Sequence, residues 1–458
     1  MKLQESTTKS RVIKLTLIAI IVAVTALATK CYADNPIVQT KFTADPAPMV
    51  YHDTIFLYTS HDEDDAPQGM GGFKMCDWLC YTTTDMVNWT DHGAVASLND
   101  FSWVKHDNGA WAPQCIERGC KFYLYCPVQG NGIGVLVANS PYGPFEDPLG
   151  KRLIETDHLW NDIDPTVFID EDDQAYLYWG NPDLYYVKLN KDMISYSGKV
   201  VKVPTKPKNY QEGPWFYKRN GHYYLAYAST CCPEGIGYAM SNSPAGPWEY
   251  KGYIMKPNPK SSGNHPGIID YKGHSYVFGF NYQLNSMLTN IHHERRSVCM
   301  EEFKYNPDGT IPELPWWSKK GVRQIGTLNP FIRTEAVTIA WESGVKTKKG
   351  SKDNMYVTDI DNGDYIKAKG VNFENKRAKS FEASVASASK GGKIEIHLDS
   401  LTGTLLGVCP VKNTGGWQNW NIQSCKVKKE KGIHDVYFVF KGDQGDLFNF
   451  DWWKFNAN

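Results

Sequence analysis

The sequence predicts an all-β protein, in which a five-bladed β-propeller is followed by a β-sandwich of the jelly-roll type. A strand–turn–strand pattern recurs five times before residue 312, and shorter alternating strands follow from about residue 329. The chain also contains 39 Gly, 25 Pro and 13% aromatic residues, a mixture that favours short strands and turns over long helices. Its 458 residues, 41% of them hydrophobic, are enough for two or three domains with real cores.

Residues 1–33 have the pattern of a secretory signal peptide. Four basic residues precede an apolar run at 15–28, and small residues around Ala33 suit a cleavage point. The apolar run is short for a membrane span, so we expect no stable membrane insertion. A lipid anchor on Cys31 is the alternative, which Lys30 directly before it fits poorly. We therefore expect a secreted, periplasmic or cell-surface protein.

The five repeats lie within residues 34–311 and share one pattern. Each starts with a polar or large residue, usually before Pro or Gly, and continues through an apolar strand, a turn with Gly or Asp, and an aromatic-rich strand. The starting residues are Asp45, Trp111, Asp164, Glu212 and His265. Their spacing of roughly fifty to sixty-five residues suits a four-stranded blade with insertions. A five-unit solenoid is the alternative, but solenoid repeats are shorter and more uniform.

The starting residues carry the chemistry. The innermost strand of each propeller blade lines the central channel, so equivalent positions face the same end of the axis. Asp45, Asp164 and Glu212 should therefore converge beside Trp111 and His265. A single Asp-Pro or Glu-Gly at a strand start is more typical of a turn, but three at equivalent positions favour a site. Clustered carboxylates raise one another's pKa, which suits the acid and base of glycosidic bond cleavage.

Five short motifs give this chain a resemblance to glycoside hydrolase family 43. They lie at residues 44–48, 111–113, 162–166, 212–214 and 264–267. Residues 84–93 and 301–310 make it most similar to the arabinoxylan arabinofuranohydrolases, which remove α-L-arabinofuranosyl branches from xylan. The resemblance implies an inverting enzyme on a five-bladed propeller that needs no cofactor.

The resemblance also implies roles for the three carboxylates. Asp45 would be the general base that deprotonates the attacking water, and Glu212 the general acid. Asp164 would orient that acid and act as its pKa modulator. In an inverting site the acid and base stand roughly 6.5–9.5 Å apart, which leaves space for one water molecule.

Three further residues are implied as substrate-binding. Arg296 matches an arginine that pairs with the carboxylates, although Arg295 beside it could take that place. His265 matches a central histidine, which in some relatives lies near a calcium ion. Trp111 is predicted as the floor or wall of the sugar site, with a core indole as the alternative.

The C-terminal residues 329–458 predict a β-sandwich, joined to the propeller by a linker at residues 312–328. This part resembles family 6 carbohydrate-binding modules through residues 363–365, 401–407, 414–417 and 447–452. The resemblance implies that two aromatic side chains enclose a xylose ring while an amide hydrogen-bonds to it. The matching positions are Tyr356, Trp417 and Asn449.

Structural calcium is a further implication for the module. Glu335 and Asp451 match two ligands, but Val337 stands where a second acidic residue is usual. A module that only packs against the propeller, without binding sugar, is the alternative.

Charge excludes one class of partner. The formal net charge is −1, which gives no electrostatic support for nucleic-acid binding. The acidic run at 62–65 lacks the spacing of a calcium loop, so we expect a solvated loop. The acidic run at 170–173 is predicted to be a hairpin turn.

The 11 cysteines do not predict a metal site. Cys76 and Cys80, and the adjacent pair at 231–232, lack the spacing and histidine partners of zinc ligands, so buried or bridged cysteines are expected. Cys409 and Cys425 lie in neighbouring strand-like runs and are candidates for a disulfide.

The leading hypothesis is therefore a secreted, exo-acting hydrolase that removes arabinofuranose from arabinoxylan, its polysaccharide partner. A β-xylosidase or an arabinan-degrading enzyme on the same propeller is the first alternative. A non-catalytic, sugar-binding surface protein is the second, but such a protein has no need of three clustered acids.

Overall fold

The computed structural model describes residues 32–128, 132–156, 162–259, 264–351, 353–374 and 376–457. The predicted signal peptide lies outside these residues except for its last two. Tyr32 forms a bridge with Arg323, and the Ala33 amide donates to the carbonyl of Val322 at 2.6 Å. In the described part of the chain, no helix has the length and apolar character to cross a bilayer.

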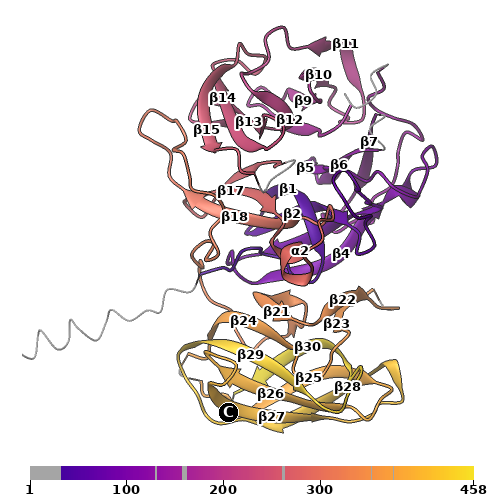
Figure 1. Cartoon of the computed structure of the whole chain (residues 1–458), viewed down its shortest axis with the longest axis vertical. Coiled ribbons are helices and arrows are strands. Elements are labelled where there is room, and N and C mark those ends of the chain that lie inside the picture. Colours follow the sequence, from indigo (N-terminus) through magenta and orange to yellow (C-terminus); the bar gives the residue numbers. More distant parts are fainter. Residues whose placement is uncertain are drawn as a thin grey trace, which may run out of the picture. The chain divides into compact units, whose positions relative to one another are not determined.

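The described residues between 42 and 303 form five antiparallel sheets, one for each predicted repeat (Figure 1). The first contains β1 (Phe42–Tyr51), β2 (Thr54–Asp62), β3 (Asp77–Thr83) and β4 (Trp89–Ser97), and the second β5 (Gln114–Arg118), β6 (Lys121–Pro127) and β7 (Ile133–Ala138). The third contains β8 (Thr166–Ile169), β9 (Ala175–Trp179), β10 (Tyr185–Leu189) and β11 (Tyr196–Lys202). The fourth contains β12 (Tyr210–Arg219), β13 (His222–Ser229), β14 (Gly235–Ser241) and β15 (Glu249–Met255). The fifth contains β16 (Gly267–Tyr271), β17 (His274–Asn281) and β18 (Ser297–Phe303).

These sheets are blades around one axis. A narrow channel of about 20 Å³ is lined by one proline from each repeat: Pro46, Pro113, Pro165, Pro214 and Pro266. Each of these prolines follows a starting residue by one or two positions. The predicted five-bladed propeller is confirmed, and the first hairpin of each repeat supplies its innermost strands.

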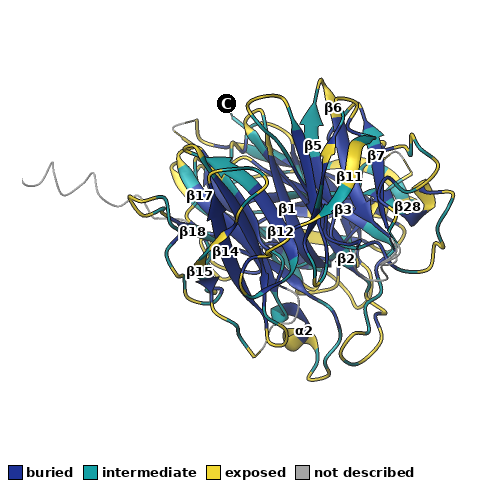
Figure 2. Ribbon diagram, turned by 90° about the horizontal axis from the view of Figure 1, so that it is seen from above, coloured by how far each residue is buried: buried dark blue, intermediate teal, exposed yellow. Residues whose placement is uncertain are grey.

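Burial explains why the inner strands are so apolar. The first eight residues of β1 are buried, whereas every residue of the outer strand β11 is exposed or half-buried (Figure 2). Inner strands pack against neighbouring blades on both faces, so they carry continuous rather than alternating apolar runs. A 3-10 turn, η1 (Leu98–Asp100), and one short helix, α2 (Gln283–Leu288), connect strands within the described propeller.

The C-terminal residues form the predicted β-sandwich. One sheet contains β22 (Lys346–Lys349), β23 (Met355–Thr358), β30 (Asn449–Asn456), β25 (Ser380–Ser387) and β28 (Gly416–Lys426), with β19 (Thr334–Glu335) beside β30. The other contains β21 (Trp341–Ser343), β24 (Tyr365–Asn372), β29 (Ile433–Lys441), β26 (Gly392–Leu398) and β27 (Thr404–Val411). Inward-facing residues of both sheets, among them Phe381, Phe438 and Trp453, form one core.

The sandwich and the first blade share hydrogen bonds. β20 (Thr338–Ile339) pairs with β4 and extends the first propeller sheet. The buried carboxylate of Asp91 accepts bonds from Lys41 Nζ and from Thr347 Oγ1 of β22, both at 2.6 Å. Burial raises the pKa of Asp91, but the Lys41 charge and these hydrogen bonds outweigh it, and the pKa is lowered.

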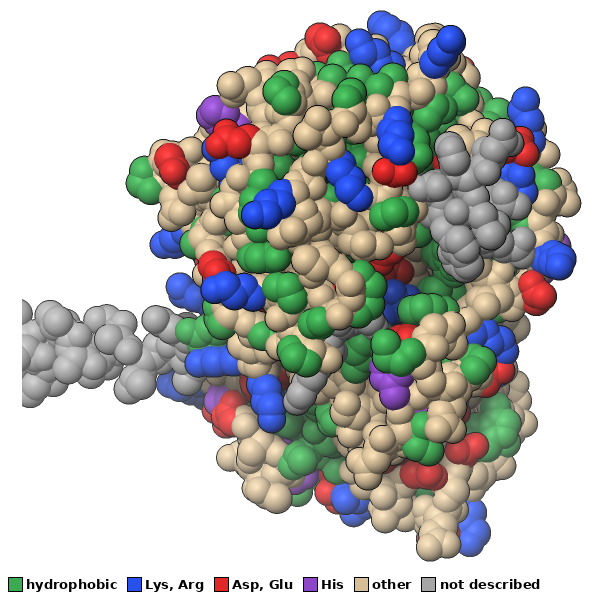
Figure 3. All heavy atoms as spheres, turned by 45° about the horizontal axis from the view of Figure 1, so that its top comes forward, with side chains coloured by type: hydrophobic (Ala, Val, Ile, Leu, Met, Phe, Trp, Pro, Cys, Tyr) green, Lys and Arg blue, Asp and Glu red, His purple; other side chains and the backbone are tan. Residues whose placement is uncertain are grey.

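Among the cysteines, one adjacent pair is bridged and the pair predicted in the sandwich is not. Cys231 and Cys232 form a disulfide with each other, and Cys80 is buried. Cys409 and Cys425 are free thiols joined by a hydrogen bond, so the structure does not contain the disulfide predicted for them. On the face drawn in Figure 3, basic and acidic side chains are interspersed and form no large patch of one sign.

Candidate active site

Asp45 reaches the channel because β1 is bulged. The pairing of β1 with β2 shifts register between Ala44 and Ala47, where Pro46 has no amide hydrogen for the ladder. Asp45 itself has a φ of 52°, a left-handed conformation that is uncommon for residues other than glycine. Its buried carboxylate accepts a bond from Ser60 Oγ at 2.6 Å.

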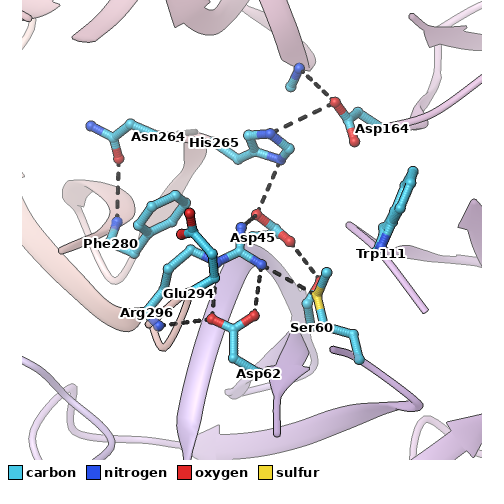
Figure 4. Close-up of polar contacts among 12 residues, drawn as sticks. Asp45, Ser60, Asp62, Trp111, Asp164, Asn264, His265, Phe280, Glu294 and Arg296 are labelled. Carbon is cyan, nitrogen blue, oxygen red and sulfur yellow. Dashed lines mark hydrogen bonds and ion pairs between the residues drawn. The ribbon is translucent and has the colours of Figure 1, made fainter. Parts of the chain in front are cut away.

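Arg296 holds the other oxygen of Asp45 (Figure 4). Arg296 Nη1 donates to Asp45 Oδ1 at 2.9 Å, while its Nε and Nη2 donate to the two oxygens of Asp62 at 2.9 and 2.8 Å. Burial lowers the pKa of Arg296, but the charges of both carboxylates raise it well above its usual value. Arg295 instead bonds to the backbone carbonyl of Asp64, so the ambiguity between the two arginines is resolved.

Asp62 therefore corrects one expectation. It was predicted to belong to a solvated acidic loop, but it is the last residue of β2 and is completely buried. Alternation along the strand explains this, because Ser60 and Asp62 face the channel while His61 faces away toward Asp77. Burial raises the pKa of Asp62, and the charge of Arg296 opposes that rise.

His265 lies between the three predicted carboxylates. Its Nδ1 is 3.3 Å from Asp45 Oδ1, and its Nε2 is 3.3 Å from Glu212 Oε1 and 3.7 Å from Asp164 Oδ2. Burial lowers the pKa of His265, but the charges of Asp164 and Asp45 and the contact with Glu212 raise it to about 10. An imidazolium at neutral pH therefore offsets the repulsion among the carboxylates.

Glu212 and Asp164 are joined through the backbone. Gly213, the residue after Glu212, donates its amide to Asp164 Oδ2 at 3.1 Å. Gly213 has a φ of 56°, and a Cβ there would meet the His265 ring at 2.7 Å, so only glycine fits. Burial raises the pKa of Asp164 to about 7; the His265 charge opposes this rise, and the charges of Glu212 and Asp45 add to it.

These groups surround a pocket of about 180 Å³. Its lining consists of Asp45, Phe73, Met75, Trp111, Ile163, Asp164, Asn181, Glu212, His265 and Arg296. Ligand sites for drug-sized molecules measure about 300–1,000 Å³, so this pocket suits a single small ring rather than a length of polymer. Trp111 lies in the pocket wall, is half-buried, and also packs against the propeller core.

The sequence reasoning missed several residues of the site, some that line the pocket and some that bond to its lining residues. Ser60 and Asp62 could have been found by pairing the first hairpin, since Ser60 lies opposite Ala44 and Asp62 opposite Phe42. Phe73 and Met75 come from the loop before β3, and no local pattern marks them.

The C-terminal module brings together two of its three predicted ligand residues. Asn449 Nδ2 donates to the backbone carbonyl of Trp417 at 2.7 Å, and the Trp417 side chain is exposed. Tyr356 does not fit its prediction: only 4% of it is exposed, and its ring packs edge-on against Trp420 at 5.3 Å. A buried ring offers no open face to a sugar, and Trp420, which packs against it, is half-buried.

The predicted calcium ligands are already satisfied by protein groups. Both oxygens of Glu335 accept hydrogen bonds from Arg333, and Asp451 accepts bonds from Asn354 and Ser384. Among the described residues, neither belongs to a group of three close His, Cys, Asp or Glu ligands. A guanidinium on Glu335 repels a cation, so these residues do not fit calcium in this arrangement.

A propeller whose axial pocket holds three carboxylates around an imidazolium is typical of a glycoside hydrolase. The chain belongs to glycosyl hydrolases family 43, whose family model matches residues 33–311, and residues 335–457 match the carbohydrate-binding module of family 6. Family 43 is an inverting family that needs no cofactor for catalysis.

Several relatives resemble the whole chain. An arabinoxylan arabinofuranohydrolase of Bacillus subtilis (strain 168) is 35% identical over 488 aligned residues, which cover 94% of each chain. An arabinoxylan arabinofuranohydrolase of Paenibacillus polymyxa is 34% identical, over 93% of this chain and 74% of the relative. A crystal structure of a family 43 arabinoxylan arabinofuranohydrolase from Bacillus subtilis, in complex with cellotetraose, superposes with a TM-score of 0.83 at 33% identity, over 93% of this chain and 97% of that one.

Proposed function

We propose that this glycoside hydrolase releases single α-L-arabinofuranosyl branches from arabinoxylan with inversion. The observation that carries the proposal is the small axial pocket, which has room for one terminal sugar at the point where the carboxylates meet. The relatives that align over nearly the whole chain are named for this activity.

Asp45 has the surroundings of a general base. Arg296, Ser60 and His265 all contact its carboxylate, two of them by hydrogen bonds donated to its oxygens. In the reaction, a water molecule held by Asp45 attacks the anomeric carbon and gives its proton to this carboxylate. The guanidinium also fixes the direction in which the carboxylate points, which is required for proton transfer.

Glu212 has the position of the general acid. Its side chain is 17% exposed at the pocket, where it can reach the oxygen that links the arabinose to the xylan. As the glycosidic bond breaks, the Glu212 proton moves to that oxygen, and the water oxygen bonds to the anomeric carbon. Asp164 contributes by holding the Gly213 amide and by adding negative charge nearby.

The separation of the two groups supports inversion. The whole imidazole of His265 stands between Asp45 and Glu212, with a 3.3 Å contact on each side. Retaining enzymes place their carboxyl groups only about 5–5.5 Å apart, whereas inverting enzymes need about 6.5–9.5 Å for the water molecule. Because the gap between Asp45 and Glu212 holds an imidazole ring, it suits the wider spacing of inverting enzymes.

Asp45→Asn and Glu212→Gln test the proposal. Each should reduce arabinose release from arabinoxylan by about 10²–10⁴-fold, the usual contribution of a general acid or base. Asp172→Asn, in the exposed turn between β8 and β9, is the matched control and should retain full activity. Proton NMR of the fresh product should show the β anomer first; unchanged activity in both variants, or release of xylose alone, would refute the proposal.

We further propose that Trp417 contributes to binding of polysaccharide by the module. It is exposed, and its ring offers an apolar face to a sugar. Trp417→Ala should weaken retention on insoluble arabinoxylan several-fold while hydrolysis of small aryl arabinosides stays unchanged. Ile422→Ala, which also removes an exposed apolar side chain from β28, is the control. Equal retention of both variants would leave the module a packing role only.

Metal removal gives a separate expectation. Every proton transfer above uses a side chain of the propeller, so EDTA should leave arabinose release unchanged. We propose that Glu335 and Asp451 bind no calcium, because Arg333 donates hydrogen bonds to both oxygens of Glu335. A calcium-dependent rise in melting temperature that Asp451→Asn abolishes would contradict this.

We also propose that the protein is exported. The basic residues and apolar run within residues 1–33 support an export signal. N-terminal sequencing of the protein recovered outside the producing cell should find the first residue near position 34; an intact N-terminus in the cytoplasm would contradict export.

A further inference from the structure

We propose that Asn181 is a positioning residue for Glu212, and that Gln211 fixes its orientation. Asn181 follows β9 of the third blade and lines the pocket, while Gln211 and Glu212 are neighbours on β12 of the fourth blade. Asn181 Nδ2 donates a hydrogen bond to Glu212 Oε2. The inference rests on the proposed role of Glu212 as the general acid.

The amide of Asn181 is held in one orientation. Gln211 Nε2 donates to Asn181 Oδ1 at 3.1 Å, which leaves the NH₂ group of Asn181 directed at Glu212. A flipped amide would place its oxygen against the carboxylate and its NH₂ group against another NH₂ group. Gln211 therefore selects the donor that Glu212 receives.

The backbone beside Asn181 is anchored as well. The Gly180 amide donates to the carbonyl of Ile163 at 3.0 Å, and the Gly180 carbonyl accepts from Tyr210 Oη at 2.6 Å. Tyr210 is buried, and it starts the same strand that carries Glu212. Asn181 is thus fixed to both blades at the point where they meet.

These contacts define how Glu212 lies in the pocket. Oε2 accepts from Asn181 and Oε1 faces His265, so the carboxyl plane is held between groups of the third and fifth blades. Removing Asn181 takes away one of the two contacts that hold this plane, so the acid should be less well oriented toward the leaving oxygen.

Two readouts separate this role from a merely structural one. In Asn181→Ala, the alkaline limb of the pH profile of kcat/KM should move to higher pH, because the variant lacks a hydrogen-bond donor to a carboxylate oxygen. The loss of rate should be about 10–100-fold on an arabinoxylan oligosaccharide, whose leaving group needs the acid, and only a few-fold on 4-nitrophenyl arabinofuranoside. Asn181→Asp, which places a second negative charge beside Glu212, should move the limb further in the same direction.

Gln211→Ala provides a second route to the same effect without touching Glu212 or Asn181. It should give a smaller shift of the same sign. Asn242→Ala, on the exposed surface of the fourth blade, is the control and should match the unmodified enzyme. Melting curves identify any variant that does not fold. If Asn181→Ala does not fold, the shift measured in Gln211→Ala tests the positioning role.

Glu212→Gln is measured alongside. If it retains full activity, the proposed function itself fails. A second outcome would overturn only the positioning role. In that outcome Glu212→Gln loses activity on the oligosaccharide, while Asn181→Ala and Gln211→Ala leave the alkaline limb in place and reduce the rate by the same factor on both substrates.

Discussion

The charged side chains at the axial pocket depend on partners that are distant in sequence. Asp45 and Asp62 come from the first blade, yet both are paired with Arg296, which directly precedes β18 of the fifth. His265 is also far along the chain from the carboxylates that it contacts. The free-energy cost of burying any one of these charges without a partner would be too high for a stable fold. The loss of one partner therefore destabilises the others.

Asp62→Asn should destabilise the protein strongly. Asn cannot accept the paired bonds of the guanidinium, so Arg296 is left with a single carboxylate, on Asp45. Removing one partner of a buried ion pair costs about 3–5 kcal/mol. Urea unfolding should therefore show a free energy of unfolding lower by that amount, together with reduced activity. Asp65→Asn, at an exposed ion pair with Lys74, is the control and should leave the free energy of unfolding nearly unchanged.

His265 makes stability depend on pH. Its pKa is raised from 6.5 to about 10 in the folded state, so the folded protein binds this proton more tightly than the unfolded chain. The stabilisation is complete below pH 6.5 and is lost as pH rises toward 10. The melting temperature should fall between pH 7 and 10, and His265→Gln should reduce that fall. An equal fall in both proteins would contradict the assigned protonation.

The inner strands position the site through breaks in their ladders. Both β1 and β12 shift register where a proline follows the functional carboxylate, and the bulge directs that side chain into the channel. Asp45, Asp164 and Gly213 have positive φ angles at these points. The proline-containing motifs are therefore a structural requirement of the pocket as well as a mark of the repeat.

Gly213→Ala tests this requirement. The new Cβ would contact the His265 ring, and the left-handed backbone adds about 1–2 kcal/mol of strain. We expect kcat/KM to fall at least about tenfold and the melting temperature to drop. Gly221→Ala, with a φ of 81° in the turn between β12 and β13, is the matched control, because its Cβ would meet nothing. It carries the backbone strain without the contact, so its kcat/KM should be unchanged.

The two modules stabilise each other through a small number of polar contacts. Besides the β20–β4 pairing, Asn88 of the propeller and Lys369 of the sandwich exchange backbone and side-chain hydrogen bonds. A truncation at residue 329 removes β20 and the Thr347 hydroxyl together. Loss of activity after such a truncation would therefore reflect the propeller as well as sugar binding, which is why point variants are the sharper test.

Thr347→Val should weaken this junction measurably. The buried Asp91 carboxylate loses one of its two side-chain donors, and a hydrogen bond to a charged group contributes about 1.5–3 kcal/mol. Calorimetry should show a lower melting temperature, with activity on small substrates retained below it. Thr358→Val, at an exposed hydroxyl on β23, should have no effect. If both variants melt together, the junction does not contribute to stability.

Local pattern was enough to predict the propeller, the sandwich and the residues that start each repeat, because turn residues and apolar runs recur wherever a blade recurs. It also placed Asp45, Asp164, Glu212 and His265 at one end of the axis, since equivalent strands face the same way. The partners of these groups could not be obtained in this way. Contacts between blades decide three features of the site: the pairing of Arg296 rather than Arg295, the burial of Asp62, and the bond from the Asn181 amide to Glu212. These contacts form only when the ring of blades closes. The prediction for Tyr356 was wrong for the same reason, because its burial depends on packing against Trp420 of another strand.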